Sequence, residues 1–206
     1  MTRVAVDSRQ EMLRTAARLF HKRGYHATSM SDVATALKLS KGGLYHHFQG
    51  KDEILFSLME NALDITQERV MNAVREIADP EQRLRTLIRL HVALVLSPAD
   101  REITVMLHEN HPLPPSLRRR INARKKAYVH FVESLVGEIQ RRRRSRNQVT
   151  PRAATFALLG MINWIYQWYR PEGKLNAEQL AREYTEIFFA GALHPGSGAE
   201  PRMAPA

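Results

Sequence analysis

The sequence of 206 residues contains no cysteine. Disulfide bonds and metal sites with thiolate ligands are therefore excluded, which is compatible with a reducing compartment. No apolar run reaches the roughly 18 residues that a membrane-spanning helix requires, and the first ten residues lack the apolar core of a signal peptide. We therefore expect a soluble, cytoplasmic protein that does not enter a membrane.

The chain also lacks the residue patterns of common enzyme sites. It has no nucleophile elbow, no glycine-rich phosphate loop and no pair of carboxylates placed for acid–base catalysis. A metal site could be drawn from His91, His108, Glu109 and His111, but their spacing does not match the two-histidine helix motif and Pro112 follows at once. We expect no catalytic activity, no metal and no cofactor.

Apolar residues recur at helical spacing along most of the chain, and no segment has the pattern of a strand. With 44% hydrophobic residues the chain can bury a core. The pattern predicts an all-α protein with about nine helices, near residues 7–23, 29–37, 40–48, 51–77, 81–96, 97–107, 117–139, 150–170 and 176–193. We expect a small domain over residues 1–53, a larger domain over 54–193, and a disordered tail over 194–206, which is rich in Gly, Pro, Ala and Ser.

Residues 29–51, SMSDVATALKLSKGGLYHHFQGK, combine two short helical signals with a very tight connection. Ser29 and Ser40 are good N-cap residues, and Asp32 can complete a capping box with Ser29. Leu44, with His47 and Phe48 following at i+3 and i+4, gives the second helix an inward side, which leaves its other side to solvent. This geometry is typical of a helix-turn-helix, which lays its second helix in the major groove of DNA.

The net charge of the chain is +10, and its distribution is uneven. Residues 118–146 carry eleven basic and two acidic side chains, whereas residues 54–117 carry a net charge of −3. A basic excess attracts polyanions such as nucleic acid, an anionic membrane surface or a phosphorylated ligand. Apolar residues continue at helical spacing through this basic region, so we expect its charge to form the solvated face of a long helix.

The first 55 residues or so resemble the DNA-binding domain of the TetR family of bacterial transcriptional regulators. The resemblance is carried by the aromatic–glycine turn from Phe20 to Tyr25, the serine-initiated second helix, and the segment from Leu44 to Glu53. It implies a second helical domain that binds a ligand and forms dimers. The sequence departs from the family at Lys38, where glycine is usual, and a left-handed backbone there would cost about 1 kcal/mol.

The resemblance also assigns roles within the helix-turn-helix. The positions that face base edges in the family are occupied by Lys41, Gly42, Gly43 and His46. The positions that contact phosphates are occupied by Ser29, Tyr45, His47 and Lys51. The chemistry agrees, because lysine and histidine can form hydrogen bonds with base edges, and glycine allows close approach of the backbone. Tyr45 and His47 could instead pack or cap locally.

One such unit reads too few base pairs to be specific, so we expect a homodimer on a palindromic operator of double-stranded DNA. In the family, the last two long helices of each subunit form the dimer interface. Here these helices correspond to residues 150–170 and 176–193. The aromatic residues that could serve such an interface are Phe156, Tyr184, Phe188 and Phe189, although an intramolecular core would use the same residues.

The run from Gly160 to Pro171, GMINWIYQWYRP, resembles TetR-type repressors that control fatty-acid and acyl-CoA degradation and respond to acyl-CoA thioesters. The resemblance implies a repressor that a small-molecule effector, an acyl-CoA, releases from DNA. The expected ligand pocket comprises His91, Met106, Tyr128, Phe131, Trp164 and Trp168. The residues expected to bind the phosphates of coenzyme A are Arg118, Arg119, Arg120, Arg124, Lys125, Arg141 and Arg142. The alternative is that these basic residues only solubilise a helix and attract DNA non-specifically.

Two other functions stay open at this stage. The first is a TetR-type regulator of drug efflux with an apolar pocket for a ligand other than coenzyme A. The second is a basic scaffold or membrane-surface protein that uses residues 118–146 and keeps the helix-turn-helix only as a packing unit. Substitution of Lys41 and Tyr45 distinguishes the scaffold or membrane-surface protein from both kinds of regulator. Only a DNA-binding regulator would then lose sequence-specific DNA binding.

Overall fold

The computed structural model describes residues 2–108, 113–143 and 149–194. This part of the chain contains ten α-helices, one π-helical segment and no strand. The all-α fold predicted from the sequence is therefore confirmed. Glu109 and His111, considered above as metal ligands, lie outside the described residues, as does nearly all of the expected C-terminal tail.

Three helices form the N-terminal unit: α1 (Thr2–Arg23), α2 (Met30–Ala36) and α3 (Lys41–His47). α1 begins before the expected start at Asp7, because residues 2–7 contain neither glycine nor proline to stop a helix. It ends at Gly24, which has a φ of +81° and donates its N–H to the carbonyl of Phe20. The side chains of Phe20, Val33 and Leu44 are fully buried where the three helices meet.

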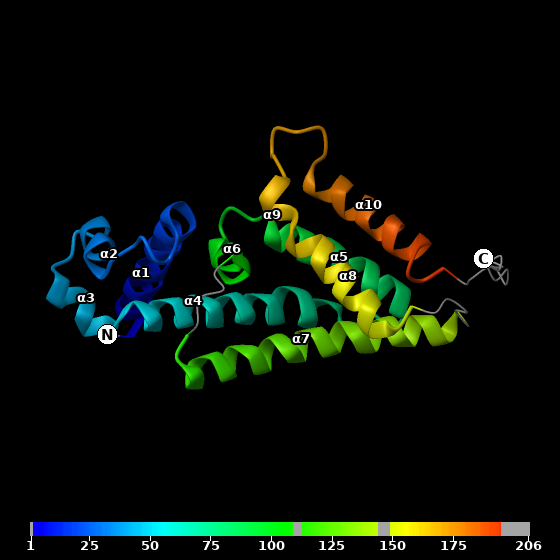
Figure 1. The fold of residues 1–206 in the computed structure, drawn as a ribbon, viewed down its shortest axis with the longest axis horizontal. Helices are drawn as coiled ribbons and strands as arrows, with labels where there is room; N and C mark the ends of the chain where they lie inside the picture. Colours follow the sequence, from blue (N-terminus) through cyan, green and yellow to red (C-terminus); the bar gives the residue numbers. More distant parts are fainter. Residues whose placement is uncertain (1, 109–112, 144–148, 195–206) are drawn as a thin grey trace, which may run out of the picture.

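α4 (Lys51–Thr66) leaves the N-terminal unit and continues as the π-helical segment η1 (Gln67–Asn72). Together they replace the regular helix predicted over residues 51–77. Figure 1 shows α4 as a long rod that connects the N-terminal unit with the rest of the chain and runs beside α7. The wider turns begin directly after Thr66, and no proline or glycine marks that place in the sequence.

The C-terminal domain consists of α5 (Pro80–Val95), α6 (Arg101–His108), α7 (Pro115–Arg142), α8 (Pro151–Asn163), α9 (Ile165–Trp168) and α10 (Ala177–Ala190). Asp79 and Thr150 cap α5 and α8 with their side chains, and a proline follows each of them. Asn176 and Gln179 form the predicted capping box of α10. No helix in the described ranges combines the length and the apolar character needed to cross a bilayer.

Two of the predicted helices differ in detail from the structure. The helix expected from Pro98 begins at Arg101, because Ser97 and Asp100 form a turn in which the Ser97 hydroxyl donates to Asp100 Oδ2 at 2.7 Å. The helix expected over residues 150–170 is divided into α8 and α9 at Trp164, whose ψ of −10° interrupts the regular helix. This break ends α8 at Asn163.

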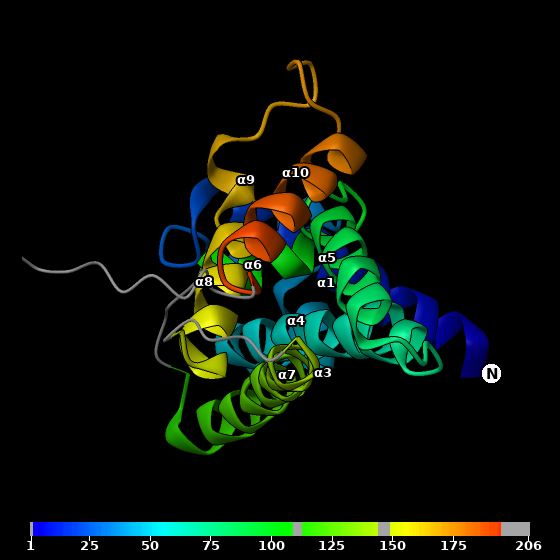
Figure 2. The ribbon, with the colours of Figure 1, turned by 90° about the vertical axis from the view of Figure 1, so that its right-hand side faces the viewer.

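Two buried cores support the fold. The core of the N-terminal unit includes the first turns of α4 and also Val105, Leu113 and Ile121, which come from α6, the segment before α7, and α7 itself. The second core lies among α5, α7, α8 and α10, and Figure 2 shows α5, α8 and α10 above α7. Because α6 and α7 contribute side chains to the core of the N-terminal unit, a movement of these helices would displace residues in that core.

Candidate DNA-binding and effector sites

The helix-turn-helix is fixed by hydrogen bonds that the sequence predicts. At the start of α2, the N–H of Asp32 donates to Ser29 Oγ at 3.1 Å, and the N–H of Ser29 donates to Asp32 Oδ2 at 2.7 Å. These bonds from the Ser29 side chain and backbone lower the pKa of the Asp32 carboxyl. At the start of α3, the N–H of Gly43 donates to Ser40 Oγ at 3.0 Å. Lys38, in the turn between the helices, has a left-handed backbone, with a φ of +56°.

The outer face of α3 carries hydrogen-bonding side chains beside Gly42. Lys41, Tyr45 and His46 are exposed, while Leu44 on the opposite side is completely buried. Around Gly42, the nearest atom to an added Cβ would be Ser40 Oγ at 4.0 Å, so the fold itself leaves room for a side chain there. Lys41, Gly42 and His46 are therefore accessible on the outer side of α3, whereas Gly43 is half-buried.

Two of the residues predicted to contact phosphates already form bonds within the protein. The ammonium of Lys51 donates to the carbonyls of Tyr25 and Thr28, each at 2.8 Å, and lies 4.3 Å from the centre of the Tyr25 ring. Ser29 donates its hydroxyl to Asp32 as part of the capping box. Lys51 thus ties the start of α4 to the loop before α2, and this structural role was not predicted from the sequence.

A cavity of about 360 Å³ lies among α4, α5, α6, α7 and α8. Its lining consists of Leu63, Thr66, His91, Ile103, Met106, Leu107, Lys125, Tyr128, Val129, Phe156, Leu159, Gly160 and Asn163. Three of the six residues predicted for the pocket, His91, Met106 and Tyr128, are brought together here. The other three do not line this cavity: Phe131 packs half-buried against the second core, and Trp164 and Trp168 are exposed.

The cavity is mostly apolar but contains a few polar groups. The Tyr128 hydroxyl and His91 Nδ1 are 2.9 Å apart; His91 is buried and Tyr128 is half-buried. Burial lowers the pKa of His91 to about 4 and raises the pKa of Tyr128, so both are neutral at pH 7. Burial also lowers the pKa of the Lys125 ammonium. Asn163 Oδ1 is buried and has no hydrogen-bond partner among the described residues.

The basic residues predicted to bind phosphates do not form one cluster. Arg118 and Arg119 are exposed, and neither pairs with a carboxylate in the described part of the chain. Lys125 lines the cavity. On the last turns of α7, Arg141 is exposed and Arg142 pairs with Glu138 at 2.9 Å.

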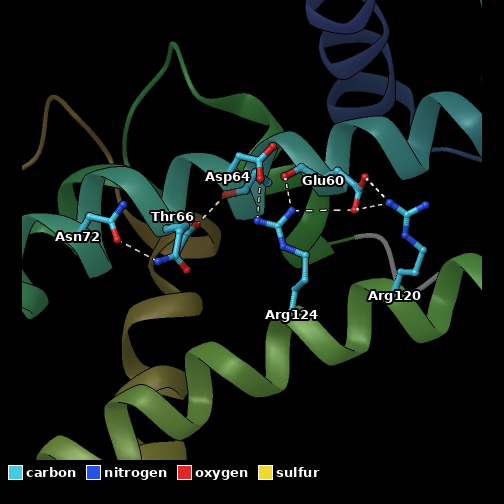
Figure 3. Close-up of polar contacts among 8 residues, drawn as sticks. Glu60, Asp64, Thr66, Asn72, Arg120 and Arg124 are labelled. Atoms are coloured by element: carbon cyan, nitrogen blue, oxygen red, sulfur yellow. Dashed lines mark hydrogen bonds and ion pairs between the residues drawn. The ribbon is translucent and has the colours of Figure 1, made fainter. Parts of the chain in front are cut away.

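Arg120 and Arg124 instead connect α7 with α4. Figure 3 shows both guanidinium groups reaching from α7 to the carboxylates of Glu60 and Asp64. Arg120 Nη2 donates to Glu60 Oε2 at 3.2 Å, and Arg124 Nη2 donates to Asp64 Oδ1 at 2.7 Å. Each pair of like charges is spaced four residues apart, so the two helices present matching rows of opposite charge. We call these four residues the α4–α7 ion-pair ladder.

A helix-turn-helix with an accessible reading face, joined by one long helix to a helical domain that encloses a cavity, is the architecture of a DNA-binding regulator controlled by a small ligand. Residues 12–58 match the model of bacterial regulatory proteins of the tetR family, and residues 78–192 match the tetracyclin repressor-like C-terminal domain. The chain belongs to the TetR family of bacterial regulators.

Three similar proteins place the chain within this family. The HTH-type transcriptional repressor KstR2 of Mycobacterium tuberculosis is 30% identical over 95% of this chain and all of its own length. The fatty acid metabolism regulator protein of Bacillus subtilis is 22% identical over 88% of this chain and 93% of its own. AibR, in a crystal structure with isovaleryl coenzyme A and operator DNA, is 39% identical with a TM-score of 0.83, covering 87% of this chain and 97% of AibR.

Proposed function

We propose that the protein is a homodimeric transcriptional repressor that binds a palindromic operator and is released by an acyl-CoA thioester with a short acyl group. The observation that carries the effector assignment is the 360 Å³ cavity with the hydrogen-bonded His91–Tyr128 pair and Lys125 in its wall. The similarity to AibR, whose structure contains isovaleryl coenzyme A and operator DNA, supports the same class of ligand.

DNA binding rests on α3. Its exposed Lys41 and His46 can form hydrogen bonds with base edges, and Tyr45 can donate to a phosphate. Because one copy of α3 reads only a few base pairs, specificity requires a second copy, and a two-fold dimer matches a palindromic site. The helices that would form the interface carry large exposed apolar side chains: Phe156 and Trp164 at α8, and Ile187 on α10.

The volume of the cavity limits the effector. Ligand pockets usually measure about 300–1,000 Å³, so this cavity is at the small end and has room for a short acyl group but not for the whole of coenzyme A. The nucleotide part would stay at the protein surface. Exposed Arg118 and Arg119 on α7 offer unpaired guanidinium groups for its phosphates, whereas Arg120 and Arg124 are already occupied by carboxylates.

Release from DNA follows from the position of α4. Leu63 and Thr66 of α4 line the cavity, and Lys51 at its other end holds the helix-turn-helix. The α4–α7 ion-pair ladder joins this helix to α7, which lines the cavity with Lys125 and Tyr128. A ligand that binds more tightly when α7 and α4 are displaced would change the spacing of the two reading helices.

The test begins with operator DNA selected from a random library by the purified protein. In gel-shift assays, isovaleryl-CoA should release this DNA and raise the melting temperature of the protein, whereas free coenzyme A should do neither. A Lys41→Gln/Tyr45→Phe variant should lose operator binding but keep its response to isovaleryl-CoA in thermal melts.

Three results would contradict the proposal in different ways. If no acyl-CoA of any length stabilises the protein or releases the operator, the effector assignment fails. If a lipophilic cation that does not bind DNA stabilises the protein and releases the operator instead, the protein is a regulator of the drug-efflux type. If the double variant binds the selected DNA as well as the wild type does, α3 is not the reading helix.

A further inference from the structure

Lys125 is the one charged side chain among the residues that line the cavity in the described part of the chain. This lining contains no aspartate and no glutamate, and burial lowers the pKa of His91 to about 4, so that histidine is neutral at pH 7. Lys125 is half-buried, so part of its side chain is accessible to a small molecule. The wall of the cavity therefore carries a positive charge without a negative one.

The fold supplies no counter-ion for Lys125. Within the described ranges, no carboxylate lies close enough to its ammonium group to form an ion pair. On α4, Glu60 and Asp64 are already bound by the arginines of the α4–α7 ion-pair ladder. Burial lowers the pKa of Lys125, and no neighbouring carboxylate raises it again. Such a charge is unfavourable, because charges that are partly removed from water are normally paired.

The position of Lys125 on α7 places it beside the acyl part of the ligand. It lies about one turn before Tyr128 and Val129, which line the same cavity. It lies about 10 Å along the helix axis from Arg118, which we assign to the phosphates of coenzyme A. Because the cavity has no room for the whole of coenzyme A, the group that meets Lys125 belongs to the acyl chain.

This position defines what a fitting acyl group must carry. An alkyl acyl group would cover Lys125 with apolar surface and leave its ammonium without a partner. A carboxylate on the acyl group would accept a hydrogen bond from the ammonium and offset its charge, which makes a stronger contact than one between neutral groups. Leu63, Ile103 and Leu107 would cover the carbon atoms between the carboxylate and the thioester.

We propose that the acyl group of the effector carries a free carboxylate, which forms an ion pair with Lys125 inside the cavity. The ligand class is then a short dicarboxylic acid joined to coenzyme A through one of its two carboxyl groups. This inference rests on the proposed function and narrows the ligand at the same cavity. Lys125 excludes an uncharged acyl group of the same length, because its ammonium would then stay without a counter-ion.

The experiment compares glutaryl-CoA with pentanoyl-CoA, whose acyl chains have the same length, by calorimetric titration of the full-length protein. Wild-type protein should bind glutaryl-CoA about 10-fold to 150-fold more tightly, as expected for one hydrogen bond between charged groups. Lys125→Met should lose this preference and bind pentanoyl-CoA at least as tightly as the wild type does. Lys126→Met is the matched control, because Lys126 is exposed and lies outside the cavity, and it should keep the preference.

The outcomes separate this inference from the proposed function. Equal binding of the two ligands by the wild type, or tighter binding of pentanoyl-CoA, would overturn it while leaving an acyl-CoA effector in place. Equal weakening of both ligands by Lys125→Met would overturn it too, because Lys125 would then bind a phosphate that both ligands share. A preference that survives in Lys125→Met would assign the carboxylate to another residue and also overturn it.

If neither ligand nor isovaleryl-CoA binds, the proposed function fails, and this inference fails with it. Should Lys125→Met not fold, Lys125→Gln takes its place, because it removes the charge and keeps a polar side chain. The same loss of preference is then expected.

Discussion

Replacement of Gly42 with alanine should stabilise the protein and weaken its binding to DNA. Gly42 lies in the first turn of α3, and an added Cβ would have no neighbour nearer than Ser40 Oγ at 4.0 Å. The methyl group therefore meets open space in the free protein. Glycine is less favourable than alanine in a helix by about 0.5–1 kcal/mol, so Gly42→Ala should raise the free energy of unfolding by that amount.

The opposite effect is expected in the complex, because the added methyl group would occupy space between the α3 backbone and the base edges. Forcing a methyl group into a packed contact costs about 1–3 kcal/mol. This corresponds to a loss of about fivefold to 150-fold in affinity for each half-site. A dimer carries the change twice, so the total loss for the operator should exceed about 25-fold.

Two measurements on the same variant decide the matter. Urea unfolding should show a higher free energy of unfolding than in the wild type, which proves that the variant is folded. Titration of selected operator DNA, by fluorescence anisotropy at fixed salt, should show the weaker binding. If Gly42→Ala binds the operator as tightly as the wild type, the backbone of α3 does not approach the bases at this position and the reasoning is refuted.

Three further predictions concern the turn, the buried histidine and the ion-pair ladder. Lys38→Gly should stabilise the protein by about 0.5–1 kcal/mol in urea unfolding, because it relieves the left-handed backbone, whereas Lys38→Ala should not. The pKa of His91 is 6.5 in the unfolded chain and about 4 in the folded protein. Protonation of His91 therefore opposes folding, and the free energy of unfolding should fall by about 3 kcal/mol as the pH decreases from 6.5 to 4. His91→Gln should flatten the loss between pH 7 and 4.5, and an unchanged slope would contradict this assignment. Arg124→Met should change the free energy of unfolding by less than about 1 kcal/mol, because Asp64 is largely exposed. The same substitution should reduce the loss of operator affinity that isovaleryl-CoA causes. An undiminished loss would show that the α4–α7 ion-pair ladder does not transmit the effect of the ligand to the DNA-binding unit.

The parts of the fold that the sequence predicts are those decided by local interactions. Ser29, Ser40 and Asn176 cap the helices that the pattern assigns to them, because a capping side chain bonds to an N–H two or three residues away. Lys38, which stands where the family usually has glycine, has a left-handed backbone. The all-α class follows from the same short-range periodicity.

The composition of the cavity depends on contacts between distant segments and could be predicted only in part. Apolar and aromatic residues on α5, α6 and α7 were expected to face a ligand, and His91, Met106 and Tyr128 do meet at the cavity. The contributions of Thr66 and Asn163 depend on two places where a regular helix gives way, at η1 and at Trp164. Neither place carries a glycine or proline that would have indicated it.

The structure pairs part of the basic charge of residues 118–146 with acidic residues of other helices. The acidic excess of residues 54–117 and the basic excess of residues 118–146 meet where α4 packs beside α7, and Arg143 adds a further ion pair with Glu81 of α5. Arg120, Arg124, Arg142 and Arg143 are therefore paired with carboxylates within the protein and are less available to a polyanion. What remains exposed and free of carboxylates among the described residues includes Arg118 and Arg119, at the end of α7 nearest the DNA-binding unit. A phosphorylated ligand bound there would add negative charge beside the ladder that joins α7 to α4, so its binding and the position of α4 would be coupled electrostatically.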